Sequence, residues 1–121
     1  MDFNTTILKG IQAEYEGRLA DAASCYHQAW AEAADHYEAC IAAHYVARTQ
    51  ESPNDIFHWN QEALILADKV HDERVSAFYP SLYVNLGRSY QLLGNQAEAE
   101  RYYMLAAGLG LVHDPEYVQA K

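Results

Sequence analysis

Two histidines and a cysteine near the middle of the chain have a spacing that could serve metal binding. His36, Cys40 and His44 follow one another every four residues, so in an α-helix they would lie along one stripe. Imidazole and thiolate are preferred ligands of Zn²⁺. A straight stripe cannot close a tetrahedron without a ligand from elsewhere, and small or apolar side chains at this spacing also suit helix packing. We keep both interpretations, favour packing, and predict no metal and no cofactor.

Motifs for catalysis are scarce in this sequence. Gly108-Leu109-Gly110 is the nearest approach to a phosphate-binding loop, but it lacks the strand before it and the helix after it that such a site needs. No local motif pairs a nucleophile with its base. The acidic residues that could act as general acids or bases are expected on exposed helix faces, namely Glu14, Glu16, Glu98 and Glu100. We therefore predict that the protein is not an enzyme.

The balance of charge limits the classes of partner. Seventeen acidic residues oppose eight basic ones, which gives a formal net charge of −9. Such a surface repels phosphate backbones and anionic lipids, so we expect neither a nucleic acid nor a membrane as partner. The first residues do not resemble an export signal, and charges interrupt every apolar run. We expect a soluble, cytoplasmic protein in which Cys25 and Cys40 are reduced.

The elements that position these residues are expected to be helices. Half of the residues are hydrophobic, Ala and Leu are prominent among them, and there are ten Tyr. Ala and Leu are strong helix formers. Only three Pro and six Gly occur, so long segments are free of helix breakers. This composition indicates a single all-α domain over residues 1–121.

A repeated pattern organises these helices. In the segment 80–113, small and aromatic residues recur at fixed spacing on two helices that a glycine separates: Tyr83, Leu86, Gly87 and Tyr90, then Gly94, then Ala99, Tyr103 and Ala106. The segment 3–36 carries part of the same pattern in Gly10, Gly17, Ala22, Tyr26 and Ala29. Small residues let two helices approach closely, and a large ring fills the space beside them. We expect each glycine turn to join two antiparallel helices.

This pattern resembles the tetratricopeptide repeat, with Tyr in place of the usual Trp and Phe. The resemblance implies a right-handed α-solenoid of about three helix pairs, with repeats at 3–36, 37–70 and 80–113 and a short C-terminal capping helix at 114–121. In the middle repeat, His44 stands where Gly is usual and Asn60 where a large aromatic is usual. Trp59 is expected to supply that packing, and the segment 71–79 to lengthen the adjoining helices.

In this family the first helices of the repeats line a concave groove that holds a peptide. Transferred to this chain, the groove positions that we favour are Ile41, Tyr45, Arg48, Val84, Asn85, Arg88 and Gln91, with Asn4, Ile7, Ile11, Glu38, Thr49, Ser81 and Leu92 beside them. Arg48, Asn85 and Arg88 would form a basic cluster suited to a carboxylate. The alternative is that both arginines only neutralise neighbouring glutamates.

The resemblance therefore implies a protein–protein interaction module, an adaptor or regulator that binds a peptide or protein segment. Another possibility is a structural module that forms homo-oligomers through the exposed ends of its helix stack. A third is a metal-dependent site at His36, Cys40 and His44. The sequence does not identify the partner.

Overall fold

The computed structural model describes residues 2–110, and within this range the chain is all-α, without β-strands. Its helices in chain order are α1 (Phe3–Tyr15), α2 (Leu19–Glu32), α3 (His36–Arg48), α4 (Pro53–Ala67), the 3-10 helix η1 (Ser76–Phe78), α5 (Tyr79–Leu92) and α6 (Gln96–Gly108). None of the helices in this range has the length and apolar composition that a membrane crossing needs. The expected capping helix at 114–121 and the end of the third repeat, 111–113, lie outside the described residues.

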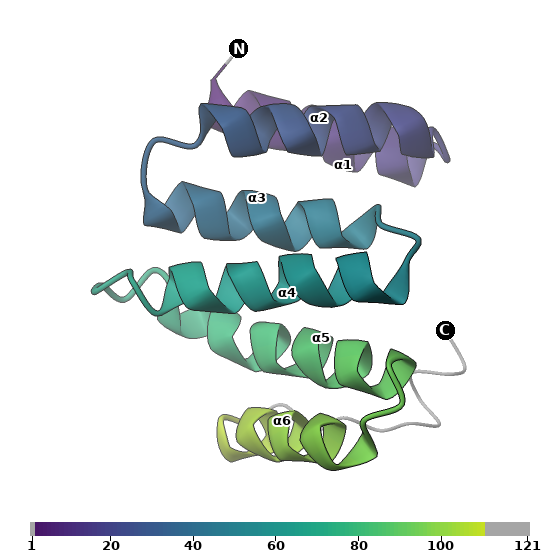
Figure 1. Ribbon diagram of the computed structural model, residues 1–121. Helices are drawn as coiled ribbons and strands as arrows, with labels where there is room; N and C mark the ends of the chain where they lie inside the picture. The colour runs from purple at the N-terminus through teal and green to yellow at the C-terminus, as the bar shows by residue number, and fades with distance from the viewer. Residues whose placement is uncertain (1, 111–121) are drawn as a thin grey trace.

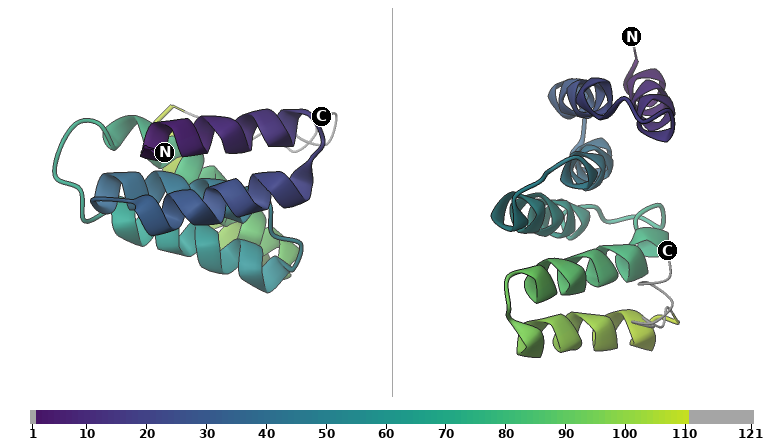
Figure 2. Two further views of the ribbon diagram at one scale, coloured as in Figure 1. Left: turned by 90° about the horizontal axis from the view of Figure 1, so that it is seen from above. Right: turned by 90° about the vertical axis from the view of Figure 1, so that its right-hand side faces the viewer.

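The helices stack in chain order, each packed on the next (Figure 1). The strongest contacts join α1 to α2, α3 to α4 and α5 to α6, so the fold consists of three helix pairs within the described range. Helices α1, α3 and α5 run in one direction, and α2, α4 and α6 run back (Figures 1 and 2). As a result, the first helices of the three pairs have their carboxyl ends on the same side of the molecule.

Local chemistry explains where these helices begin and turn. Asp2 and Asp35 accept hydrogen bonds from the backbone N–H of the residue three positions later, each at 2.8 Å, and so cap α1 and α3. Pro53 and Pro80 lie in the first turn of α4 and α5, where a missing N–H has no cost. Gly17 and Gly94 turn the chain inside the first and third pairs.

Both of these turn glycines have a backbone conformation that other residues rarely adopt. Their φ angles are 79° and 81°, in the left-handed region. Because the two glycines hold the same place in their pairs, the turn predicted after each first helix is present in both.

A glycine beneath a tyrosine ring closes the first and third pairs. A Cβ atom added to Gly10 would lie 2.4 Å from Cε1 of Tyr26, and one added to Gly87 would lie 2.5 Å from Cε1 of Tyr103. Only a residue without a side chain permits this approach. The packing predicted for Gly87 and Tyr103 is therefore confirmed, and the first pair repeats it.

The middle pair is built differently. Trp59 of α4, which we expected to supply the packing of the missing tyrosine, packs against the core cluster that includes Cys40, Ala43 and Ala63 of α3 and α4. Its ring also meets that of Trp30 on α2 edge-on, with 5.1 Å between ring centroids. Trp59 therefore joins the core of the middle pair to the first pair.

The segment between the second and third pairs also differs from expectation. We expected residues 71–79 to lengthen the adjoining helices, but α4 ends at Ala67 and the chain follows an irregular path to η1. Val75 is buried in the core, and Tyr79 donates a hydrogen bond to Asp68 at 2.7 Å. These contacts close the connection into a compact loop that brings Phe78 to the start of α5.

Candidate functional site

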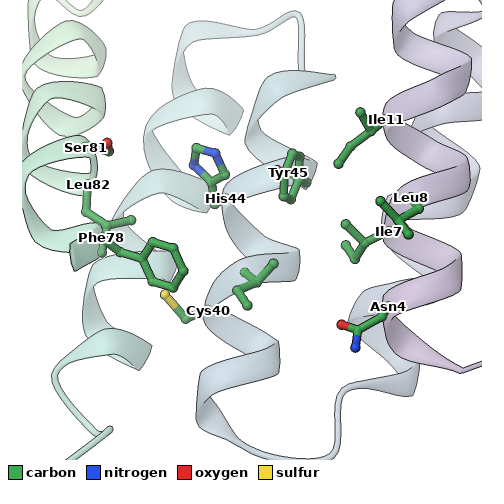
Figure 3. A pocket seen from close by; sticks show the side chains of 11 residues that line it. Asn4, Ile7, Leu8, Ile11, Cys40, His44, Tyr45, Phe78, Ser81 and Leu82 are labelled. Atoms are coloured by element: carbon green, nitrogen blue, oxygen red, sulfur yellow. The ribbon is translucent and has the colours of Figure 1, made fainter. Parts of the chain in front are cut away.

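The first helices of all three pairs surround one apolar hollow. It has a volume of about 640 Å³ and is lined by Asn4, Ile7, Leu8 and Ile11 of α1, Cys40, Ile41, His44 and Tyr45 of α3, and Phe78, Ser81 and Leu82 of η1 and α5. We call this set the apolar hollow. Figure 3 shows α3 as its floor, with α1 and α5 on either side. A site of this size and character suits apolar side chains of a ligand.

The spacing of its residues explains why these side chains meet. The residues from α1 lie at positions i, i+3, i+4 and i+7, and those from α3 at i, i+1, i+4 and i+5, so each set occupies one helix face. Leu8 is 64% exposed and Ile11 36% exposed. The hollow is therefore open to solvent along α1, while Ile7, Cys40 and Leu82 of its lining belong to the core.

A second, smaller hollow lies beside the first, toward the carboxyl ends of α3 and α5. Its volume is about 200 Å³, and its lining comprises His44, Ala47, Arg48, Ile56, Asn60, Asn85, Arg88, Ser89 and Leu92. We call it the basic hollow. His44 lines both hollows, so the two are neighbours on one concave surface. Two guanidinium groups in one small hollow stand out in a chain with a net charge of −9.

Arg48 is already engaged within the chain. Its Nη2 lies 2.6 Å from Oε2 of Glu14, and its Nε is within hydrogen-bond distance of both carboxylate oxygens. Tyr26 donates its hydroxyl hydrogen to the same carboxylate at 2.8 Å. Hydrogen bonds from Arg48 hold the pKa of Glu14 below its ordinary value. This ion pair bridges α1 and α3, and half of the Arg48 side chain remains open to solvent.

Arg88 makes no ion pair or hydrogen bond with any residue of the described range, and its side chain is exposed. The two arginines of the basic hollow therefore differ: Glu14 partly neutralises Arg48, whereas no carboxylate of residues 2–110 pairs with Arg88.

Amide and hydroxyl groups form the inner wall of the basic hollow. Asn60 of α4 is 7% exposed and donates to Oγ of Ser89 at 2.8 Å. Ser89 donates in turn to the backbone carbonyl of Asn85 at 2.8 Å. The Asn85 amide lies 3.3 Å from Nδ1 of His44. This network joins α3, α4 and α5 where the outer pairs have a tyrosine ring.

His44 is held in its neutral form by its surroundings. Burial lowers the pKa of its imidazole, and the positive charge of Arg48 acts in the same direction. The Glu14 carboxylate opposes them more weakly. A neutral imidazole can accept the hydrogen bond of the Asn85 amide at Nδ1.

The stripe His36, Cys40 and His44 does not come together as a set of metal ligands. His36 is exposed at the start of α3, whereas Cys40 is buried in the core. Burial raises the pKa of the Cys40 thiol to about 11, which disfavours the thiolate that a metal would need. Across residues 2–110 no three His, Cys, Asp or Glu side chains form a group that could hold a metal ion.

Most of the groove residues expected from the sequence line one of the two hollows. Ile41 and Tyr45 line the apolar hollow, together with Asn4, Ile7, Ile11 and Ser81. Arg48, Asn85 and Arg88 meet in the basic hollow, with Leu92 beside them. The residues expected in a single groove are therefore divided between two neighbouring hollows that share His44.

Four expected groove residues line neither hollow. Glu38 accepts a hydrogen bond from the backbone N–H of Ala34 at 2.9 Å, and Thr49 donates its hydroxyl hydrogen to the backbone carbonyl of Val46 at 3.0 Å. Val84 is only 8% exposed and lines neither hollow, because it faces the interior from α5. Gln91 accepts a hydrogen bond from the Tyr103 hydroxyl at 2.8 Å, so its amide faces α6. Gln91 therefore contacts the second helix of the third pair.

Several lining residues were not expected from the repeat pattern. Leu8, Cys40, His44, Phe78 and Leu82 belong to the apolar hollow. Phe78 reaches it only because η1 interrupts the segment that we expected to be helical. Asn60 lines the basic hollow and was also not expected there. The sequence signal that could have indicated it is a small polar side chain at a position that an aromatic ring usually holds.

Comparison with protein-family models, curated proteins and solved structures finds no match to this chain. The geometry of the two hollows is therefore the basis on which a function can be assigned.

Proposed function

We propose that the chain is a helical-repeat protein of the tetratricopeptide kind, and that its concave surface binds a segment of another protein. One observation carries the proposal: an apolar hollow of about 640 Å³ to which all three first helices contribute. Concave, mostly apolar hollows of about 300–1,000 Å³ are typical of ligand-binding sites. The glycine–tyrosine crossings in the first and third pairs support the repeat assignment.

A matched pair of leucine variants tests the proposal. Leu8 lines the apolar hollow and is 64% exposed, whereas Leu19 of α2 is 61% exposed and lies outside both hollows. Leu8→Glu and Leu19→Glu therefore add the same charge at similar exposure. We expect proteins that the wild type retains from host lysate to be retained by Leu19→Glu and lost by Leu8→Glu, as quantified by mass spectrometry.

Circular dichroism would first establish that both variants keep the helical content of the wild type. Equal retention by the two variants would contradict the groove as the binding surface.

A second candidate function is self-association through the last helix pair. Met104 and Leu109 of α6 are 74% and 56% exposed, and Leu92 of α5 is 59% exposed. Within the described range α6 packs mainly on α5, and no further helix of residues 2–110 lies beyond it. Sedimentation of the wild type and of Met104→Glu over a range of concentrations separates this function from segment binding. A concentration-dependent mass that the substitution abolishes would favour self-association.

A further inference from the structure

The backbone requirements of a bound segment constrain its conformation in the apolar hollow. An extended segment has unpaired N–H and C=O groups that need partners, and burying them unpaired costs about 1–3 kcal/mol each. The lining offers few side-chain hydrogen-bonding groups, namely those of Asn4, His44, Tyr45 and Ser81. Its helices already use their own backbone groups. An α-helix satisfies its backbone internally, so it fits this lining better than an extended chain.

The length of the hollow sets the length of such a helix. Along α1 the lining runs from Asn4 to Ile11, which corresponds to about 10 Å at 1.5 Å per residue. A bound helix would cover this distance with two to three turns and with apolar residues at i, i+3 or i+4, and i+7. Figure 3 shows α1 and α5 flanking α3, so a bound helix would lie over α3 between these two walls.

The charge of the neighbouring hollow orients the bound helix. Arg88, which has no ionic partner in residues 2–110, lies in the basic hollow near the carboxyl ends of α3 and α5. Acidic residues are most favourable in the first turn of a helix, and antiparallel helix dipoles attract each other. A helix running antiparallel to α3 places its first turn at this basic end, so acidic residues there would meet Arg88.

We propose that the occupant of the concave surface is an amphipathic α-helix of two to three turns, antiparallel to α3, with its apolar face in the apolar hollow and an acidic first turn at Arg88. This inference rests on the proposed function, since it requires that the surface binds a protein segment. It names the chemistry of that segment.

Three display libraries of 15-residue segments test the conformation and the polarity. The first has apolar residues randomised at i, i+3, i+4 and i+7 and two glutamates in the first turn. The second moves the glutamates to the last turn. The third keeps the composition of the first but alternates apolar and polar residues, which favours an extended strand.

We expect binders to come from the first library, to be retained by Leu19→Glu and lost by Leu8→Glu, and to gain helical circular dichroism when bound. Binders with these variant responses from the alternating library would overturn the helical occupant while leaving the proposed function intact. Equal enrichment from the second library would overturn the orientation. A failure of all three libraries to give Leu8-sensitive binders would count against both proposals.

A pair of arginine variants tests the role of the basic hollow. Arg88→Gln is compared with Arg101→Gln, since Arg101 lies on α6 outside both hollows. For a selected binder we expect Arg88→Gln to weaken binding about threefold to tenfold, as measured by fluorescence anisotropy, and Arg101→Gln to leave it unchanged. Replacing the first-turn glutamates of the binder with glutamine should abolish the difference. Equal affinities for wild type and Arg88→Gln would overturn the contact.

Discussion

In the α1–α2 and α5–α6 pairs a glycine lies beneath a tyrosine ring, whereas the α3–α4 pair has His44 and Asn60 at the corresponding positions, each 34 residues after Gly10 and Tyr26. In the outer pairs the tyrosine fills the crossing, and its hydroxyl bonds a side chain four residues after the glycine, Glu14 or Gln91. In the middle pair the larger side chain is on the first helix and the smaller one on the second.

Because of this exchange, the basic hollow lies where a tyrosine ring fills the space between the two helices of an outer pair. His44 and Asn60 both line it, and Asn60 bonds Ser89 of the next helix pair. The comparison teaches that the polar part of the candidate site lies where the repeat pattern is broken. Regular packing stabilises the two ends, and the irregular middle pair supplies groups that can meet a ligand.

The largest expected effect on the free energy of unfolding comes from disturbing the contact between glycine and tyrosine in the outer helix pairs. Gly10→Ala would place a Cβ atom against the ring of Tyr26, which is fully buried, and overpacking of this kind costs about 1–3 kcal/mol. Gly87→Ala should cost less, because Tyr103 is only partly buried and its ring can move. Urea denaturation measures both changes.

The matched control is Gly108→Ala on α6, where an added Cβ atom would meet nothing within 4 Å. We expect its stability to be unchanged or slightly raised. A loss of stability as large as that of Gly10→Ala would show that the contact with the tyrosine ring does not explain the effect.

A size reversal in the middle pair tests whether His44 and Asn60 compensate each other. Asn60→Tyr alone should destabilise the protein by about 1–3 kcal/mol through overpacking. His44→Gly alone should cost about 1 kcal/mol or more from helix propensity and lost contacts. The double variant restores the arrangement of the outer pairs, so we expect it to lose about 0.5–3 kcal/mol less than the sum of the single variants. Additive losses in chemical denaturation would refute compensation.

The ion pair between Glu14 and Arg48 gives a smaller effect. A double-mutant cycle with Glu14→Gln and Arg48→Gln should report a coupling of about 0.5–1 kcal/mol, reduced because half of Arg48 is open to solvent. The same cycle for Glu98 and Arg101, an exposed pair within α6, should show a weaker coupling. Addition of salt should reduce both values, and a coupling for Glu14 and Arg48 no larger than that of the control would argue against a bridge between helices.

The smallest expected effect is a dependence of stability on pH through His44. Because burial depresses the pKa of His44 in the folded state below its ordinary 6.5, protonation favours the unfolded chain. This contribution to stability is fully present above about pH 6.5 and declines as the pH falls below that value. Thermal unfolding of wild type and His44→Gln at pH 7.5 and 5.5 checks this.

We expect the wild type to lose more Tm than the variant over this interval. An identical loss in the two proteins would mean that His44 does not titrate differently in the folded and unfolded states.

The fold class and the outer crossings could be predicted because they depend on local spacing. Tyr83, Leu86 and Gly87 recur at helical period, and Gly94 with its positive φ ends the first helix of the third pair. The irregular loop before α5 could not be predicted in the same way. Its path depends on the burial of Val75 and on the hydrogen bond from Tyr79 to Asp68. Both are contacts that the spacing of residues along one helix does not specify.

By itself, the sequence determined that the chain forms helices and where glycine turns separate them, and it predicted that Ile41, Tyr45, Arg48, Asn85 and Arg88 lie on the first helices of the pairs. Those features follow from helix propensity, from the special conformation of glycine and from helical periodicity. Only the tertiary structure decided that these residues are divided between an apolar and a basic hollow, that Glu14 pairs with Arg48 whereas Arg88 has no ionic partner in residues 2–110, and that Phe78 joins the lining. Each of these depends on side chains from different helices meeting in space, which no spacing along a single helix specifies.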